Sequence, residues 1–423
     1  MVLEFSVKNF RSIHELQTLS FRATGLRSSV DLAHVDRNNI CPADGENVLK
    51  TIGIYGANAS GKSNVIRAFT SFLEVVGAEA TSESNLSKVS EPFFFQPPSN
   101  NDNETFFQIV LLLKGKKYRY GFTTKRTIEV DVDSREKNLT VIDSEWLQGT
   151  YRSNMKFYFT RKKTTATLHE PIDNGKIPTK LPYGHSLFLT HASAFDSEGE
   201  CTMVRNFIKQ YTITNISKGF TNFRWHSFIA LEKETRQRRF LDLLNQFNLK
   251  YDDVYLSKAE GDEYDLSRVN FIKNVSYKGR DFRAVLNLEQ HESEGTQRLF
   301  EIAGFLLRAF SMETTGLVIL DEIDSNFHPF LVMKIVQMFN NPQFNSYNCQ
   351  LLFTSHDTNL LSPEILRRDQ IYFTEKSLDE STRLYSLADL RGIRNDADFA
   401  KQYLAGFYGG LPIMDTLINS TDN

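Results

Sequence analysis

The chain has 423 residues, which predicts two or three structural lobes, or one domain with a large insertion. Apolar residues make up 40% and charged residues 24%, proportions that are typical of a globular protein and exclude wholesale disorder. A net charge of −3 gives the protein as a whole no attraction for nucleic acid. Three widely separated cysteines indicate neither a disulfide framework nor a zinc site. We expect a cytoplasmic protein with no signal peptide and no membrane span.

The amino-terminal residues predict two strands, a loop and the start of an α/β unit. Leu3–Val7 alternates apolar and polar residues like a half-buried strand, and a second strand is expected at Thr18–Arg22. Residues 24–47 are polar and rich in turn-forming residues, so we expect a loop. The apolar run Thr51–Tyr55 predicts a buried strand, and the spacing of apolar residues over Asn64–Val76 predicts a helix.

The middle of the chain predicts β structure followed by helices. Strand-like runs separated by turn signals indicate an antiparallel sheet, which lies between expected loops at 78–103 and 162–183. Residues 198–250 have helical spacing, and residues 269–288 return to strand character. The runs of the antiparallel sheet are Glu104–Leu113, Lys117–Thr124, Thr127–Val132, Thr140–Leu147 and Lys156–Thr160.

The last part of the chain alternates helices with short apolar strands. This alternation is typical of a parallel sheet covered by helices. Sustained heptads are absent, which excludes a long coiled coil. The expected helices are Leu231–Phe247, Glu294–Phe310 and Phe330–Phe339, and the expected strands are Leu317–Leu320, Gln350–Thr354 and Ile371–Thr374.

A phosphate-binding loop is predicted between the strand Thr51–Tyr55 and the following helix. The segment fits GxxxxGK[ST], and its position between a strand and a helix is the context that this motif requires. Backbone N–H groups would wrap the phosphates, Lys62 would reach the β- and γ-phosphates, and the Ser63 hydroxyl would ligate Mg²⁺. Its residues are Gly56, Ala57, Asn58, Ala59, Ser60, Gly61, Lys62 and Ser63.

Two carboxylates follow the buried strand Leu317–Leu320. The end of a parallel strand would deliver Asp321 to Mg²⁺, and Glu322 would polarise the attacking water. Taken alone, the pattern also describes a strand that ends in solvated acids, and the phosphate loop favours the functional interpretation. After the strand Gln350–Thr354, His356 is placed to donate a hydrogen bond to a γ-phosphate, or is a surface histidine. The neighbouring Ser355 and Asp357 form no triad with it, because adjacent strand residues point to opposite faces.

In their order along the chain, these motifs resemble the ABC-type ATPase head of the SMC, RecF and OLD class. Val7–Ile13 resembles the "KNFRS" segment of that class, and Asn64 extends the phosphate loop in the same way. The resemblance implies an α/β fold, an ABC-type P-loop NTPase head with an antiparallel β subdomain and a helical insertion. It also implies ATP and Mg²⁺ as ligands, and a homodimer or higher homo-oligomer formed through the heads.

The same resemblance implies roles for further residues. Arg11 and Ser12 would touch the nucleotide, Asn58 would lie by the γ-phosphate or the lytic water, and Asp324 would begin the D-loop. Gln96 and Gln108 remain alternatives for the Q-loop glutamine. A helix start that reads SEGTQ would be the signature that acts in trans on a partner's nucleotide, although its alternative interpretation is a simple helix cap. Its residues are Ser293, Glu294, Gly295, Thr296 and Gln297.

Four further motifs resemble the stand-alone AAA ATPases of prokaryotic defence islands, which include the AbiLi and RloA types and the AriA subunit of PARIS systems. This resemblance implies an ATP-binding and hydrolysing sensor or scaffold subunit of an antiphage, abortive-infection system. Such a subunit would control a separate toxic effector, which we expect to be a nuclease, and its trigger would be DNA or a phage protein. The motifs are Ser186–Leu189, Asp321–Asp324 with His328–Pro329, Arg367–Ile371, and Tyr403–Gly406 with Tyr408–Gly409 and Pro412.

The alternative function is that of an SMC/RecF-like DNA-repair or recombination ATPase that acts directly on DNA. A scaffold with a dead nucleotide site is the third hypothesis, and the intact Lys62, Asp321 and Glu322 argue against it. The basic stretch Lys233–Arg239 is a solvated helix face or a nucleic-acid contact.

A fused metal-dependent nuclease is not expected. Acidic residues alternate on one face of a predicted strand pair, where they are better explained as a solvated sheet face than as a metal site. These residues are Glu129, Asp131 and Asp133. We divide the chain into an amino-terminal part of the head with the phosphate loop (1–90), a β-rich part (91–197), a helical insertion (198–265) and a carboxyl-terminal part of the head (266–423).

Overall fold

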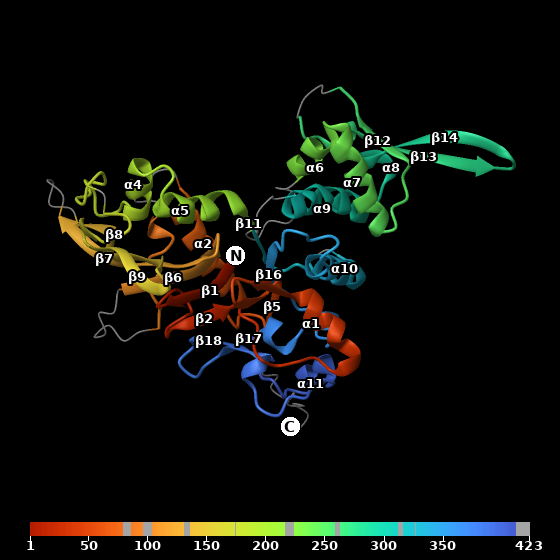
Figure 1. Ribbon diagram of the computed structural model, residues 1–423. Coiled ribbons are helices and arrows are strands. Elements are labelled where there is room, and N and C mark those ends of the chain that lie inside the picture. The colour runs from red at the N-terminus through yellow and green to blue at the C-terminus, as the bar shows by residue number, and fades with distance from the viewer. Residues whose placement is uncertain are drawn as a thin grey trace, which may run out of the picture.

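The computed structural model describes residues 1–78, 86–95, 104–130, 136–173, 175–215, 224–258, 263–311, 316–325 and 327–411. Figure 1 shows three groups of elements around the central sheet: a β-rich lobe, a lobe of helices with a projecting hairpin, and a carboxyl-terminal layer. In the described part of the chain no helix has the length and apolar character needed to cross a membrane.

The central sheet consists of six strands in the order β11-β15-β16-β5-β17-β18. The first five are mutually parallel and β18 is antiparallel to β17. The middle strands β15, β16 and β5 are buried along their whole length, which explains why their sequences are continuous apolar runs. The bounds are β11 (Thr212–Asn215), β15 (Leu317–Leu320), β16 (Gln350–Thr354), β5 (Thr51–Gly56), β17 (Ile371–Lys376) and β18 (Thr382–Ser386).

A second, antiparallel sheet of seven strands has the order β10-β9-β8-β7-β6-β1-β2. It confirms the predicted antiparallel sheet, but the separate strand expected at Thr127–Val132 is wrong, because one continuous strand, β7, runs from Lys116 to Val130. The loop expected at 162–183 also contains a short strand, β10. The bounds are β1 (Val2–Lys8), β2 (Gln17–Ser20), β6 (Glu104–Leu113), β7 (Lys116–Val130), β8 (Glu136–Tyr151), β9 (Asn154–Lys162) and β10 (Thr165–Leu168).

Helix α2 (Lys62–Gly77) joins the two sheets into one core. Phe69 stacks on Phe5 of β1 with ring centroids 4.1 Å apart, and Phe72 packs on Phe107 and Phe122 of β6 and β7. The same cluster includes apolar residues of β5, β15 and β16. The helix that follows the phosphate loop is therefore fixed by burial on both sides. Helices α4 (Phe188–Phe195) and α5 (Glu200–Tyr211) also lie in the β-rich lobe (Figure 1).

The helical lobe is built on the long helix α9, against which α6 and α7 pack. The prediction of one helix over Leu231–Phe247 is wrong in detail, because the chain breaks at Glu232–Lys233 between α6 and α7. The strands expected at 269–288 are confirmed as the hairpin β13–β14, which projects from the lobe (Figure 1). The bounds are α6 (Arg224–Leu231), α7 (Glu234–Gln246), β12 (Asp253–Leu256), β13 (Val269–Tyr277), β14 (Arg280–Asn287), α8 (Leu288–His291) and α9 (Glu294–Ser311).

The expected loop at 24–47 is wrong. It contains a 3₁₀ turn, helix α1 (Ala33–Asn39) and the hairpin of β3 (Ile40–Ala43) and β4 (Glu46–Leu49). Helix α1 is polar and is held by distant partners: Asp36 pairs with Arg367, and the Asn39 amide donates to Gln370 at 2.7 Å. Helices α10 (Pro329–Asn340) and α11 (Phe399–Leu404) complete the described fold, and His328 caps α10 ahead of Pro329.

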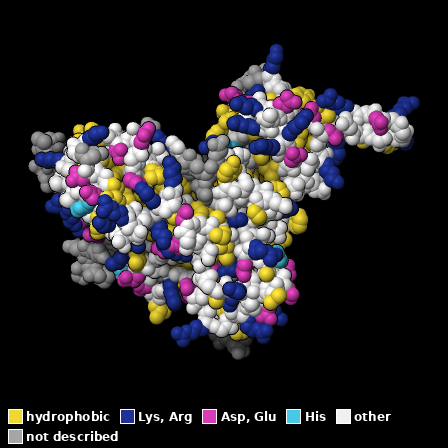
Figure 2. Space-filling model, in the orientation of Figure 1, with side chains coloured by type: hydrophobic (Ala, Val, Ile, Leu, Met, Phe, Trp, Pro, Cys, Tyr) yellow, Lys and Arg dark blue, Asp and Glu magenta, His cyan; other side chains and the backbone are white. Residues whose placement is uncertain are grey.

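The surface shows how charge is distributed over these lobes. Figure 2 shows several Lys and Arg side chains over α6 and α7 with acidic side chains among them, and acidic and basic side chains are also mixed over the β-rich lobe.

Candidate active site

The carboxyl edge of the central sheet brings together the main sequence motifs. Strand β5 ends at Gly56, β15 ends at Leu320 before Asp321, and β16 ends at Thr354 two residues before His356. Because these strands are parallel neighbours with β16 in the middle, their following loops meet at one edge. The structure therefore places the phosphate loop, the acidic pair and the histidine in one site.

Two glycines give the phosphate loop its path. Gly56 and Gly61 have φ of 150° and 108°, which L side chains rarely adopt. A Cβ on Gly56 would lie 2.5 Å from the carbonyl oxygen of Thr374, and one on Gly61 would lie 2.1 Å from the Thr382 hydroxyl. Ser60 of the loop is bonded to β17, because its hydroxyl lies 2.6 Å from the hydroxyl of Thr374 in a hydrogen bond. Strands β17 and β18 thus hold the phosphate loop in place through Thr374 and Thr382.

Lys62 begins α2 and is buried. Its ammonium donates to the carbonyl oxygens of Gly56 and Ala57 at 2.8 and 3.0 Å, so it spans the loop. Burial lowers the pKa of this ammonium, and the carboxylates of Asp321, Glu322 and Asp324 act in the opposite direction. Because burial disfavours the charged form of this lysine, a nearby anion would stabilise that form. A nucleotide phosphate would supply such an anion.

Thr354 connects the acidic pair to the central sheet. Its side chain is fully buried, and its hydroxyl donates to Asp321 Oδ1 at 2.6 Å and accepts from the Glu322 N–H at 2.7 Å. Glu322 itself is exposed and has φ of 50°, a left-handed conformation that costs energy in a residue with a Cβ. One threonine hydroxyl therefore orients the carboxylate of Asp321 and stabilises the turn that presents Glu322.

Asp324 connects the acidic turn to the histidine loop. Its Oδ2 accepts from the backbone N–H of His356 at 3.1 Å, whereas its buried Oδ1 has no partner among the described residues. The side chain of His356 is exposed at the sheet edge. A movement of either loop would therefore be transmitted to the other through this hydrogen bond.

The residues present fit a nucleotide-bound Mg²⁺ ion. The Ser63 hydroxyl is exposed in the first turn of α2, and Asp321 keeps a second oxygen that accepts no hydrogen bond from the described residues. No group of three or more Asp, Glu, His or Cys side chains that could hold a metal occurs in the described part of the chain. A single hydroxyl and a single carboxylate suit an ion that takes its other ligands from phosphate and water. Asp321 and Ser63 would hold that ion, which would supply charge neutralisation at the phosphates.

Ser12 and Arg11 take different positions. The Ser12 hydroxyl accepts from the Asn64 amide at 2.7 Å and bonds to the Thr382 hydroxyl at 2.7 Å, so it braces the first turn of α2. Arg11 instead pairs with Glu91, with 2.7 Å between its Nε and a carboxylate oxygen. Asn58 and Ala59 are exposed at the tip of the phosphate loop. A direct contact of these residues with nucleotide stays a prediction.

The expected signature begins α9, as predicted. The Ser293 hydroxyl lies 3.3 Å from the Thr296 backbone N–H, and Gln297 donates to the carbonyl oxygen of Leu288 in the short helix α8. Figure 1 shows α8 and the start of α9 at the root of the projecting hairpin, away from β5. Within one chain the signature and the phosphate loop lie in different lobes, so their cooperation stays a prediction.

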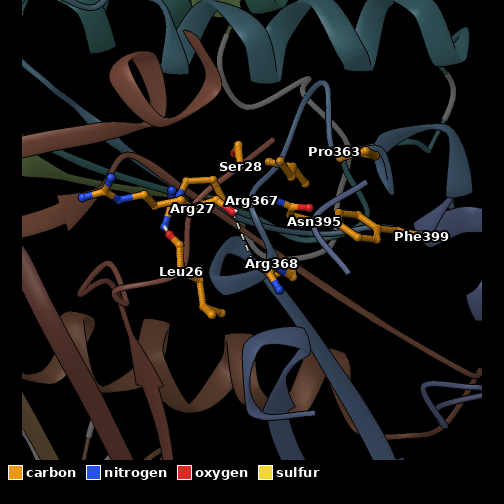
Figure 3. A pocket seen from close by; sticks show the side chains of 9 residues that line it. Leu26, Arg27, Ser28, Pro363, Arg367, Arg368, Asn395 and Phe399 are labelled. Atoms are coloured by element: carbon orange, nitrogen blue, oxygen red, sulfur yellow. Dashed lines mark hydrogen bonds between the residues drawn. The ribbon is translucent and has the colours of Figure 1, made fainter. Parts of the chain in front are cut away.

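Several motifs that resemble defence ATPases have a structural explanation. Figure 3 shows the small pocket beside Arg367 and Arg368, which encloses about 10 Å³, the volume needed by one water. Arg367 donates twice to Asp369 and once to the carbonyl oxygen of Leu26, and Arg368 donates to that of Arg27. This cluster fastens residues 22–39 to the start of β17 and leaves no room for a ligand.

The motif at 186–189 is explained by a buried ion pair. Glu145 and Arg161 are both fully buried, with 2.9 Å between their charged atoms. Glu145 also accepts from the first two N–H groups of α4, those of Phe188 and Leu189, at 2.7 and 2.8 Å. The motif is thus the start of a helix that is capped by a buried carboxylate.

The carboxyl-terminal motif lies next to Gly56, the first residue of the phosphate loop. The Tyr385 hydroxyl donates to the carbonyl oxygen of Tyr408 at 2.6 Å, and a Cβ on Gly410 would lie 3.6 Å from the Cα of Gly56. Pro412 of the same motif lies outside the described residues.

The remaining predicted positions add little to the site. Gln108 lies inside β6, paired with Ser6 and Gly121, and Gln96 lies outside the described residues. Asp131 and Asp133 lie outside them too, and the side chain of Glu129 is not described. Sequence reasoning missed Thr354, Thr374 and Thr382; the only available signal was a threonine at or near the end of an apolar run.

A comparison with known families agrees with this geometry. A family model described as "AAA domain, putative AbiEii toxin, Type IV TA system" matches residues 52–173 and 195–362, more than half of the chain. The matched residues include the phosphate loop, the acidic pair and the histidine. No curated protein matches the chain.

Proposed function

Because the chain belongs to this AAA-domain family, which is linked to abortive infection and toxin–antitoxin systems, we propose that it is an ATP-hydrolysing sensor subunit that controls a separate toxic effector. The family's domain has the P-loop NTPase α/β fold, and such domains generally bind ATP with Mg²⁺ and hydrolyse it. The proposal adds three finer points: an ABC-type head, head-to-head assembly, and an effector encoded by another gene.

One observation carries the proposal: Thr354 and Asp324 connect the acidic turn after β15 with the histidine loop after β16. Asp321 and Glu322 are oriented by Thr354, and the loop of His356 is bonded to Asp324. In the proposed reaction, Lys62 holds the phosphates, Glu322 polarises the attacking water, and His356 donates to the γ-phosphate. Loss of that phosphate would release the His356 loop and, through Asp324, the turn that carries Glu322. A site built in this way suits a two-state switch.

The ABC-type assembly is supported by the position of the signature. Residues 293–295 at the start of α9 are exposed, a helix start suits an anion, and the start of α9 lies away from the phosphate loop of its own chain (Figure 1). A second copy would bring its signature to this site, so hydrolysis would open the dimer.

Copurification tests the control of a separate effector. Tagged Glu322→Gln protein, which should be trapped with ATP, is expressed together with its genomic neighbours, purified, and analysed by mass spectrometry. The matched control is Lys62→Ala, which should not hold ATP. We expect a stoichiometric nuclease or other toxin that copurifies differently with the two variants. Recovery of the ATPase alone from both would refute the sensor function, and hydrolysis that rises with added DNA ends would then favour the DNA-repair alternative.

A further inference from the structure

A second cavity lies in the helical lobe, away from the ATP site. It has a volume of about 440 Å³, within the range of small-ligand pockets. We call it the α6–α9 groove. It is lined by α6, α7 and α9 together with Gln210 at the end of α5, and its main lining side chains are Trp225, Ile229, Arg236, Arg239, Leu307 and Arg308.

Three arginines give the groove its charge. Arg236 and Arg239 come from α7 and Arg308 from α9, and no carboxylate is among the described residues that line the groove. No ion pair joins any of the three to a carboxylate among the residues that the structure describes, whereas Arg11, Arg22 and Arg394 elsewhere on the surface each have such a partner. Figure 2 shows several Lys and Arg side chains over α6 and α7. Unpaired guanidinium groups that converge from two helices are typical of a phosphate site.

An aromatic face accompanies the charge. Trp225 is 36% exposed, and the guanidinium carbon of Arg308 lies 5.9 Å from the centre of its ring. The neighbouring His226 is buried, and burial together with Arg308 lowers its pKa to about 4, so it remains neutral beside the arginines at physiological pH. An exposed indole next to arginines offers a stacking surface for a base and charge for the attached phosphate.

The groove is rigidly connected to α9. Helix α6 crosses α9 so closely that a Cβ on Gly304 would lie 2.2 Å from the backbone nitrogen of Ser227. The Ser227 hydroxyl donates to the carbonyl oxygen of Phe300 at 2.6 Å and accepts from the Gly304 N–H at 3.0 Å. The groove is therefore formed before any ligand binds, and α9 connects it to the expected signature.

We propose that the α6–α9 groove binds a nucleotide unit, with its base stacked on Trp225 and its phosphates on Arg236, Arg239 and Arg308. The unit is a free nucleotide or part of a single strand, since the two share this chemistry. The alternative interpretation of the basic stretch is a solvated helix face. It accounts for Arg236 and Arg239, but not for the exposed indole of Trp225 and for Arg308, which face them from other helices. The proposal concerns a site separate from ATP hydrolysis and does not depend on a toxic effector.

Fluorescence anisotropy of a short labelled thymidine oligonucleotide on the full chain tests this proposal. Lys62→Ala protein is used so that the ATP site does not contribute. We expect binding that Arg236→Glu and Arg239→Glu each weaken by about tenfold or more. Trp225→Ala should weaken it by about 5- to 100-fold. The matched control is Arg280→Glu, the same charge change at an exposed position of the hairpin in the same lobe, which should leave binding unchanged.

Three further readouts separate the outcomes. Bound oligonucleotide should quench tryptophan fluorescence, and Trp225→Phe should abolish the quenching while Trp146 still reports that the chain is folded. Displacement by thymidine monophosphate would identify a free nucleotide as sufficient, whereas displacement only by an unlabelled oligonucleotide would identify a strand. Absence of binding, binding that Arg236→Glu leaves unchanged, or equal displacement by polyglutamate without quenching would each overturn the proposal.

Discussion

Replacement of Thr354 by valine tests how the acidic pair is held. Valine has the same shape, so packing is preserved, but both hydrogen bonds of the hydroxyl are lost. The bond to the Asp321 carboxylate is worth about 1.5–3 kcal/mol because its acceptor is charged, and the Glu322 N–H is left unpaired at a cost of about 1–3 kcal/mol. If only the loss of the bond to Asp321 affects the site, hydrolysis falls by about 10- to 160-fold, since 1.36 kcal/mol corresponds to a tenfold change in rate.

The assay is steady-state phosphate release over a range of Mg²⁺ concentrations. Thr354→Val should lower the rate and raise the Mg²⁺ concentration needed, because Asp321 loses its orientation. Thr354→Ser keeps the hydroxyl and is the matched control, so it should hydrolyse ATP at nearly the wild-type rate. Wild-type hydrolysis by the valine variant, or equal damage from serine and valine, would refute this explanation of the site.

Three further predictions concern stability and pH. Glu145→Gln should lower the free energy of unfolding by about 3–5 kcal/mol in urea denaturation, because Arg161 would be left as an uncompensated buried charge; a change below about 1 kcal/mol would contradict this. Gly304→Ala should destabilise the chain by about 1–3 kcal/mol through overpacking at the α6–α9 crossing, whereas Gly295→Ala in the same helix, where the new Cβ makes only an ordinary contact with the Ser293 hydroxyl at 3.7 Å, should be neutral or stabilising. His226 has a pKa of about 4 in the folded chain against an ordinary value of 6.5, so the unfolded chain binds more protons between these values. Stability should therefore rise with pH from about 4 to 6.5, and His226→Gln should flatten that rise in urea denaturation measured at several pH values; an unchanged slope would contradict the assignment.

The sequence was sufficient to predict which edge of the central sheet carries the candidate site. The strands β5, β15 and β16 are buried on both faces, so each appears as an apolar run that ends at a motif. Parallel order then follows from the intervening helices. The phosphate loop was predictable for the same reason, since its glycines, Lys62 and Ser63 have a fixed spacing.

Other elements depend on partners that are far away in sequence. Helix α1 has few apolar residues and is held by Arg367 and Gln370, more than 300 positions away, so no local pattern predicts it. Strand β11 is short and polar at its ends, and it exists because it pairs in parallel with β15 at the sheet edge. Part of the expected helical insertion (198–265) therefore contributes a strand to the central sheet.

The supporting residues of the site were missed for a similar reason. Thr354 and Thr382 look like ordinary strand residues, and their roles appear only when strands distant in sequence become neighbours. The position of Arg11 depends likewise on Glu91, which the motif does not include.

The most direct test of the central claim compares ATP binding and hydrolysis by the wild-type chain, Lys62→Ala and Glu322→Gln. Binding is followed with a fluorescent ATP analogue and hydrolysis by phosphate release, both with Mg²⁺ present. We predict that the wild-type chain hydrolyses ATP, that Glu322→Gln binds ATP without turnover, and that Lys62→Ala loses binding. Turnover at the wild-type rate by Glu322→Gln, or undiminished binding by Lys62→Ala, would contradict the assignment of the site.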